Sequence, residues 1–200
     1  QMAMGMSEGL QEALSELQRL ELIYEKTLFP EPEYTFKHAL TQDVAYGSLL
    51  VRSRKQIHER VGNAIEQLYP HRQDEFCETL AHHYSKAEDL EKAYRYYRLS
   101  GDKAFRNYSM SESFRYYKEA LSVLVRLPDT RENKMRRVEV TVSITQPMLA
   151  LSFEGDSLQI LDEGRRLAEE IGDSVSQAKL YAFMAHGASF KGDSARCVEY

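Results

Sequence analysis

A short phrase that recurs at a fixed distance constrains the fold of this chain more than any other feature. Ser152 to Ser157 (SFEGDS) returns thirty-seven residues later as Ser189 to Ser194 (SFKGDS). In each copy the Gly tolerates the left-handed backbone that ends a helix, and the Asp is a good N-cap for the next helix. A period of this length is typical of helix pairs that stack on one another.

A second recurrence lies upstream, inside the stretch from Leu80 to Leu124. Tyr94 to Arg98 (YRYYR) is answered twenty residues later by Phe114 to Lys118 (FRYYK). This offset is shorter than a full repeat and indicates an irregular junction, whereas the thirty-seven-residue offset is close to the tetratricopeptide period. We therefore expect a mainly α protein, in which residues 71–200 form a tetratricopeptide-like α-α superhelix. Only seven residues follow Asp193, so the array is expected to be truncated at its C-terminal end.

One stretch reads as a strand by its period alone. Val138, Val140, Val142 and Ile144 alternate with polar residues, which is the pattern of a half-buried β-strand. Because no partner strand is evident in an otherwise helical region, we interpret residues 138–147 as a helix, kinked at Pro147 by the loss of an N–H donor.

The first seventy residues have a different pattern. An apolar face made by Leu10, Leu14 and Leu17 predicts a helix with Ser7 as its N-cap. Two β-prone runs at 22–26 and 34–38 flank a connection with two prolines, which predicts a β-hairpin. A helix followed by a hairpin resembles the back half of a winged-helix domain, so residues 7–70 are interpreted as a winged-helix remnant. Residues 1–6 are expected to be disordered or foreign to the protein.

Two further helices are expected to close this remnant. The first should turn Val44, Ala45, Leu49 and Leu50 inward. The second should begin near Arg54, after a capping box from Ser53 to Gln56, and end before Pro70. Its inward face is expected to comprise Ile57, Val61, Ala64, Ile65 and Leu68.

Composition excludes several classes of function. The chain has 26 basic and 31 acidic residues, a net charge of -5, which argues against nucleic acid as the main partner. It has no run of eighteen apolar residues and no visible signal peptide, so no membrane association and a cytoplasmic location are expected.

Residues Tyr34 to Tyr46 (YTFKHALTQDVAY), followed by Leu49, Leu50 and a basic helix, carry a resemblance to a known group of proteins. The stretch resembles the segment after the ATPase core in bacterial signalling proteins that join a class III adenylate or guanylate cyclase, or a LuxR-type regulator, to a STAND/AAA-type ATPase and a tetratricopeptide tail. The resemblance implies a protein-protein interaction and regulatory module of a larger signalling ATPase or nucleotide cyclase. Its partner would be a protein, a peptide or another domain of the parent chain.

No catalytic, cofactor-binding or metal-binding residues are predicted. The chain lacks a Gly-x-x-x-x-Gly-Lys-Ser phosphate loop. His82 and His83 are adjacent, so on a helix they point about 100° apart and cannot chelate one ion together. The remaining histidines show no ligand spacing, and Cys77 and Cys197 match no metal or redox motif.

A partner-binding groove is the site that the repeats predict. Glu78, His82 and Lys86 share one stripe of a helix, and His186 takes the position equivalent to His82 in the later repeat. Grooves of helical arrays bind peptides through such polar groups. The alternative is a solvated polar face.

A second hypothesis is a DNA-binding transcriptional regulator fragment. Residues 52–60 contain four basic side chains, Arg52, Arg54, Lys55 and Arg60, next to the winged-helix remnant. Glu59 and the acidic composition weigh against it.

Overall fold

The computed structural model describes residues 2–27 and 33–192, with side chains for residues 9–26 and 33–192. The chain divides into two compact units, the first ending at Arg54 and the second beginning at Lys55. Each unit is described by itself.

The first unit contains a helix, a hairpin and a second helix. Helix α1 (Met2–Arg19) precedes β1 (Ile23–Thr27) and β2 (Glu33–Phe36). The strands are antiparallel, with Ile23 opposite Phe36, and the register shifts between Glu25 and Thr27. The predicted hairpin is confirmed, whereas its proline-containing tip lies outside the described residues.

Helix α1 begins earlier than predicted, at Met2 rather than after Ser7. Residues 2–6, expected to be disordered, are therefore helical in the structure. Met and Ala are strong helix formers, and one interior glycine, Gly5, costs only about 1 kcal/mol.

Helix α2 (Ala39–Ser48) buries none of its residues. Val44 is 64% exposed and Leu50 77% exposed, so the prediction that this helix turns them inward is wrong. The sequence showed an apolar face, but no described element of the first unit covers it.

Helix α3 (Val51–Leu68) starts one turn before the predicted position, which places the expected capping box of Ser53 and Gln56 inside the helix. Its buried residues are His58 and Gly62, whereas Ile57 and Leu68 are 44% and 71% exposed. The predicted inward face is therefore wrong for these two and for Ala64, which is also exposed. The helix instead packs through the side on which Gly62 admits an aromatic ring, because a Cβ at Gly62 would lie 2.8 Å from Cζ of Tyr84.

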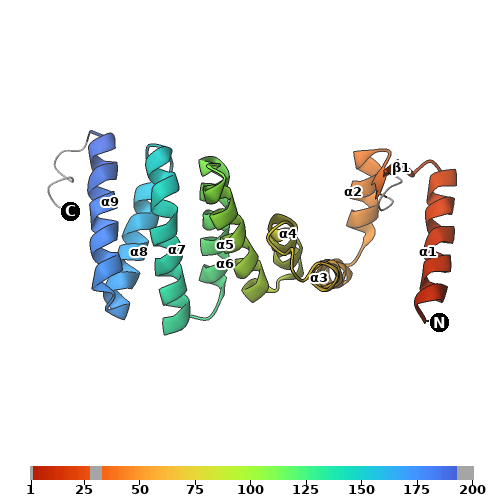
Figure 1. Ribbon diagram of the computed structural model, residues 1–200, viewed down its shortest axis with the longest axis horizontal. Coiled ribbons are helices and arrows are strands. Elements are labelled where there is room, and N and C mark those ends of the chain that lie inside the picture. Colours follow the sequence, from red (N-terminus) through yellow and green to blue (C-terminus); the bar gives the residue numbers. More distant parts are fainter. Residues whose placement is uncertain (1, 28–32, 193–200) are drawn as a thin grey trace. The chain divides into compact units, whose positions relative to one another are not determined.

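The rest of the second unit is a row of helices in chain order (Figure 1). Each helix from α4 to α9 packs against the next, and α7 also contacts α9. The row comprises α4 (Cys77–Ala87), α5 (Leu90–Arg106), α6 (Met110–Arg126), α7 (Arg131–Ala150), α8 (Ser157–Ile171) and α9 (Ser174–Phe190).

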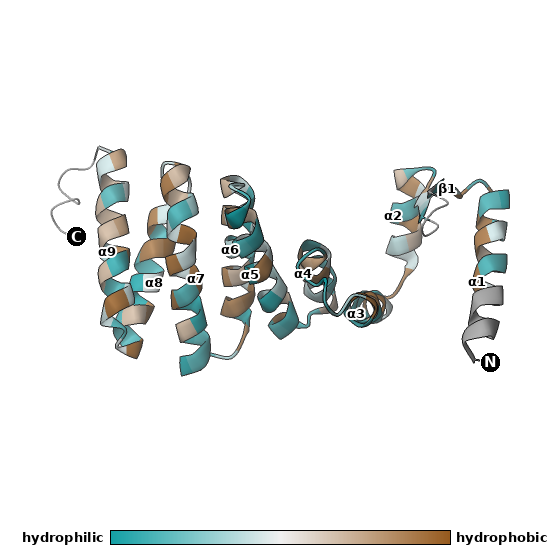
Figure 2. Cartoon of the chain, in the orientation of Figure 1, coloured by the Kyte–Doolittle hydropathy of each residue, from teal (hydrophilic) through white to brown (hydrophobic). Residues whose placement is uncertain are grey.

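Residues 138–147 are helical and lie within α7, as interpreted from context. The strand-like alternation has a physical cause: α7 packs against α6, α8 and α9, so it buries Val138, Val140 and Thr141 on more than one side. A helix covered on several sides loses the single apolar stripe of an amphipathic helix. Figure 2 shows its first turns as hydrophilic and its later part as more hydrophobic.

The Gly of the repeated Gly-Asp pair has the predicted backbone conformation, but Asp156 does not act as the predicted N-cap. Gly155 has a φ of 61° and Gly192 a φ of 72°, the left-handed conformation predicted for the glycine of each copy, and Gly172, at the end of α8, has a φ of 79°. Asp156 precedes α8 but makes no capping hydrogen bond, and its carboxylate binds Lys118 instead. Asp193 lies outside the described residues.

One apolar core runs through the row, from Leu80 on α4 to Met184 on α9. The two copies of the repeated phrase contact each other beside this core, since the ring of Phe190, which is 58% exposed, lies 5.8 Å from that of the buried Phe153 between centroids. Across the described ranges, no helix is both long and apolar enough to traverse a bilayer.

Candidate functional site

The predicted groove residues fall into two separate places. On α4, Glu78 forms an ion pair with Lys103 at 2.9 Å, and His82 packs edge-on against His58 of α3. Lys86 lies near the same His58 ring, whose pKa its charge helps to lower. His186, on α9, has its Nδ1 2.8 Å from the carbonyl oxygen of Ala182 on its own helix. No described contact joins His186 to the α4 residues.

The ion pair with Lys103 favours the charged form of Glu78. Burial by itself raises the pKa of this carboxyl, but the hydrogen bond from Lys103 and neighbouring donors outweighs burial, so the pKa lies below its usual value. Glu78 is therefore a charged, internally paired group rather than an open acceptor.

Two histidines that the sequence left unrelated lie together in the structure. Nδ1 of His58 is 2.9 Å from Nδ1 of His83, which requires one ring to donate and the other to accept. Burial, followed by neighbouring positive groups, lowers the pKa of both imidazoles. The pair favours neutral rings and joins α3 to α4. Within residues 2–27 and 33–192, no group of three or more His, Cys, Asp or Glu side chains could hold a metal ion.

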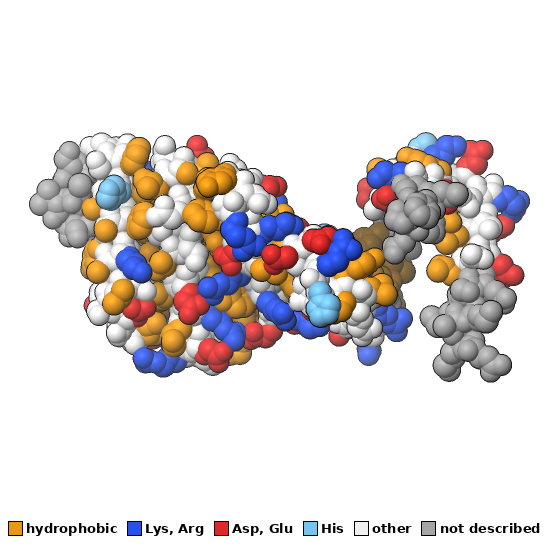
Figure 3. All heavy atoms as spheres, in the orientation of Figure 1, with side chains coloured by type: hydrophobic (Ala, Val, Ile, Leu, Met, Phe, Trp, Pro, Cys, Tyr) orange, Lys and Arg blue, Asp and Glu red, His pale blue; other side chains and the backbone are white. Residues whose placement is uncertain are grey.

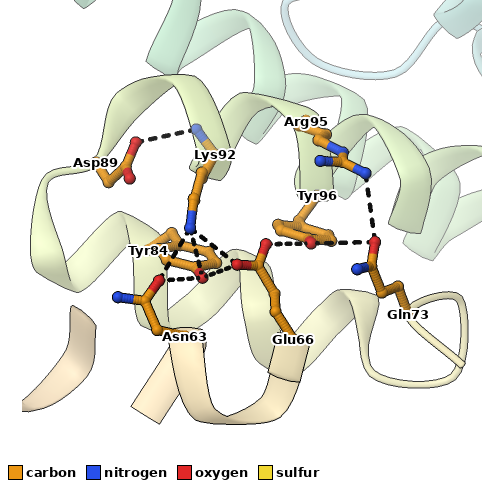
Figure 4. A network of polar contacts seen from close by, with 8 residues as sticks. All are labelled: Asn63, Glu66, Gln73, Tyr84, Asp89, Lys92, Arg95 and Tyr96. Atoms are coloured by element: carbon orange, nitrogen blue, oxygen red, sulfur yellow. Dashed lines mark hydrogen bonds and ion pairs between the residues drawn. The ribbon is translucent and has the colours of Figure 1, made fainter. Parts of the chain in front are cut away.

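A polar cluster around Glu66 makes a second connection between α3 and the row (Figure 4). The Glu66 carboxylate accepts hydrogen bonds from the phenols of Tyr84 and Tyr96 and from Nζ of Lys92, the last at 2.8 Å. Asn63 accepts from Tyr84 and Lys92 as well. The carboxylate, the two phenols and the ammonium of this cluster all have partners inside the chain, so its role is structural.

The same arrangement recurs one step along the row. Gly101 on α5 lies against the ring of Tyr117 on α6, where a Cβ would come within 2.7 Å. The Tyr117 hydroxyl donates to Asp102 at 2.6 Å. In both places a glycine admits a tyrosine ring, and a polar side chain following the glycine accepts the hydrogen bond of the hydroxyl.

The candidate binding site is a pocket of about 180 Å³ enclosed by α6, α7 and α8. Its apolar wall includes Leu121 and Val125 of α6 and Ile160 and Leu167 of α8. The floor contains Thr141 of α7 and Gly164 of α8, which approach so closely that a Cβ at Gly164 would lie 2.4 Å from Cγ2 of Thr141. Cavities of about 150 Å³ lined by apolar side chains bind ligands as large as benzene. The pocket therefore has room for one branched or aromatic side chain.

Four charged residues line this pocket, and three are engaged within the chain. Lys118 donates to both carboxylate oxygens of Asp156, at 2.8 and 2.7 Å. Glu163 accepts from the side-chain amide of Gln159. Arg137, half-buried on α7, makes no side-chain hydrogen bond or ion pair to any residue in the described part of the chain.

Sequence reasoning missed this pocket. Ile160 and Leu167 pack against apolar clusters, but nothing in the sequence shows that a gap between α6 and α8 leaves one side of them open. The adjacent pair Arg136 and Arg137 gave no signal either. Only the structure separates Arg136, paired with Glu91 and Glu132, from its neighbour.

The basic stretch of the DNA-binding hypothesis is partly engaged inside the chain. The Arg54 guanidinium lies 5.1 Å from the centre of the Tyr46 ring and donates to the carbonyl of Leu49. Lys55 pairs with Glu88. On the face of the second unit that Figure 3 shows, Lys and Arg side chains are interspersed with Asp and Glu, and they do not form a uniform basic surface of the kind that binds a phosphate backbone.

Comparison with known proteins adds no assignment: no protein family, curated protein or solved structure matches this chain.

Proposed function

We propose that this protein is a non-catalytic protein-interaction and regulatory module, with residues 71–200 as a tetratricopeptide-like superhelix that binds a partner segment between α6, α7 and α8. The observation that carries the proposal is the pocket of about 180 Å³, which has an apolar wall and a charged rim. Recognition sites of this kind bury an apolar anchor and orient it with a few polar groups.

The place of the module in a larger protein is a further part of the proposal. The likeness of Tyr34 to Tyr46 to the segment after a STAND-type ATPase core supports a role beside an ATPase or nucleotide cyclase. In such a protein the array would report the binding of a partner to the catalytic domains. Saturable nucleotide hydrolysis or cyclisation by this chain, abolished by a point substitution within it, would contradict a non-catalytic role.

The pocket can be tested by filling it. Peptides selected by phage display on the full chain should bind the unaltered protein and lose at least about tenfold in affinity to Ser122→Trp, because the indole would occupy the space of the anchor. Ser122 lines the pocket from the exposed side of α6. Glu119→Trp is the matched control, since Glu119 is exposed on the same helix and outside the pocket.

Isothermal titration calorimetry measures the affinity of the selected peptides for the unaltered chain, Ser122→Trp and Glu119→Trp. Equal affinity of the selected peptides for Ser122→Trp and the unaltered chain would show that they bind elsewhere. Failure to select any peptide would count against the proposed function itself.

A further inference from the structure

The charge state of the pocket says more about the partner than its volume does. This inference rests on the proposed function and concerns the same pocket. Of the four charged residues in the lining, Lys118 and Asp156 neutralise each other through two hydrogen bonds. Glu163 receives a hydrogen bond from Gln159 at 3.0 Å. The Arg137 guanidinium is therefore the one ionic group of the lining that has no partner among the described residues.

Three other half-buried arginines of the row differ from Arg137, because each forms an ion pair. Arg98 pairs with Glu139 at 2.7 Å, Arg136 with Glu91 at 2.8 Å, and Arg165 with Glu169 at 3.0 Å. These three half-buried guanidinium groups of the row thus each pair with a carboxylate. A guanidinium has a planar set of donors that matches a carboxylate in two-point contact.

The apolar wall stands next to this cation. Leu121 and Val125 line the pocket from α6 and Ile160 and Leu167 line it from α8, while Arg137 and Thr141 come from α7 one helical turn apart. Residues four apart on a helix lie on the same face, so a ligand that reaches the Thr141 floor also passes the Arg137 side of the pocket.

We infer that the pocket recognises a partner peptide by an apolar side chain the size of leucine together with an adjacent carboxylate, which Arg137 binds. The carboxylate is either the C-terminus of the partner or the side chain of an Asp or Glu next to the anchor. Both sources present a carboxylate to Arg137, and they differ only in whether the partner chain continues beyond the anchor residue.

Small probes test the two halves of this recognition separately. The full chain, labelled with ¹⁵N, is titrated with N-acetylleucine, N-acetylleucinamide, N-acetylalanine and acetyl-Leu-Asp-amide, with the amides of Thr141 and Gly164 as reporters in the pocket. N-acetylleucine should bind about tenfold more tightly than N-acetylleucinamide, the effect of one hydrogen-bonded charge pair. N-acetylalanine should bind more weakly than N-acetylleucine because it leaves most of the pocket unfilled.

Substitutions of Arg137 test whether this residue causes the preference for the acid over the amide. Arg137→Gln should remove the difference between the acid and the amide, and Arg137→Lys should keep part of it. Arg115→Gln is the control, because it removes the same charge from an exposed position on α6 outside the pocket, and it should leave the preference unchanged. Arg137-dependent binding of acetyl-Leu-Asp-amide that is tighter than that of N-acetylleucine would identify an internal acidic residue as the source, and the reverse order a C-terminus.

Failure takes two distinct forms. Equal affinity for N-acetylleucine and N-acetylleucinamide would overturn the role of Arg137 while leaving an apolar peptide pocket, and the proposed function, in place. No shift at Thr141 or Gly164 with any of the probes would overturn the inference and count against the pocket as the binding site.

Discussion

The phenol of Tyr84 on α4 donates a hydrogen bond of 2.7 Å to the carboxylate of Glu66 on α3. The ring reaches Glu66 because Gly62, one turn earlier on α3, has no side chain in its way. Tyr84 also stacks on Tyr96 at 5.7 Å between ring centroids. A single tyrosine thus connects three helices through its face, its hydroxyl and its contact with a glycine.

Removing this hydroxyl should weaken the connection of α3 to the row. Tyr84→Phe is expected to lower the free energy of unfolding by about 1.5 kcal/mol, the typical value of a hydrogen bond to a charged group. Tyr97→Phe on α5 is the matched control, because the hydroxyl of Tyr97 makes no hydrogen bond to any residue that the structure describes. Urea denaturation followed by circular dichroism measures both, and equal losses would contradict the assigned role of the Tyr84 hydroxyl.

Glu66 should make stability depend on pH in the acid range. Burial alone would raise the pKa of this carboxyl, but the hydrogen bonds from Lys92, Tyr96 and Tyr84 together bring it below the ordinary value of 4.5. A carboxyl whose pKa is lower in the folded state stabilises the fold above its unfolded pKa, and this contribution is lost as the pH falls through the folded value.

At pH values below 4.5, the urea concentration at the unfolding midpoint should therefore decrease more steeply with falling pH for the unaltered chain than for Glu66→Gln. Parallel pH profiles of the two proteins would show that Glu66 does not contribute this dependence.

The His58–His83 pair predicts a second pH dependence nearer neutrality. Burial, then the charges of neighbouring groups, lowers the pKa of both rings from the ordinary value of 6.5. The unfolded chain therefore takes up protons at a higher pH than the folded chain does, so stability is complete above 6.5 and declines as the pH falls through the folded values.

Substitution of both histidines by glutamine should flatten the stability profile in this window. A direct NMR titration of His83 should show an inflection below 6.5, while an inflection above that value would reverse the predicted sign. Lys86→Gln should move the inflection of His58 upward, because it removes one of the positive charges that disfavour protonation of His58.

The close approach of α7 and α8 at the pocket floor can be tested with one methyl group. In Gly164→Ala the new Cβ would lie 2.4 Å from Cγ2 of Thr141. The side-chain and backbone shifts that such overpacking forces typically cost about 1–3 kcal/mol of stability. Gly9→Ala is the control, because its added Cβ would meet no described atom within 4 Å apart from its neighbours and the local backbone of its own helix, and alanine is favoured over glycine in a helix interior by about 1 kcal/mol.

Thermal unfolding should thus show a lower midpoint for Gly164→Ala and an unchanged or higher one for Gly9→Ala. The double variant with Thr141→Ala should recover part of the loss, since it removes the nearest atom. A neutral effect of Gly164→Ala would mean that the two helices separate readily.

Local signals in the sequence determined the helices of the second unit. Asp89 and Asp173 cap α5 and α9 by accepting hydrogen bonds from Lys92 and Ser176, and Gly172 ends α8 in the left-handed conformation. Caps, breakers and the thirty-seven-residue phrase act between neighbours in the chain, so they can be read without the fold.

The tertiary structure decided which faces are buried and which charges are left without partners. Ile57 belongs to an apolar stripe yet is 44% exposed, because α3 packs through Gly62, and His58 meets His83 although twenty-five residues separate them. Arg136 and Arg137 are identical in the sequence, but only Arg136 faces acidic side chains. Burial and charge pairing depend on which residues from distant segments meet, and helix periodicity specifies a face without specifying what lies against it.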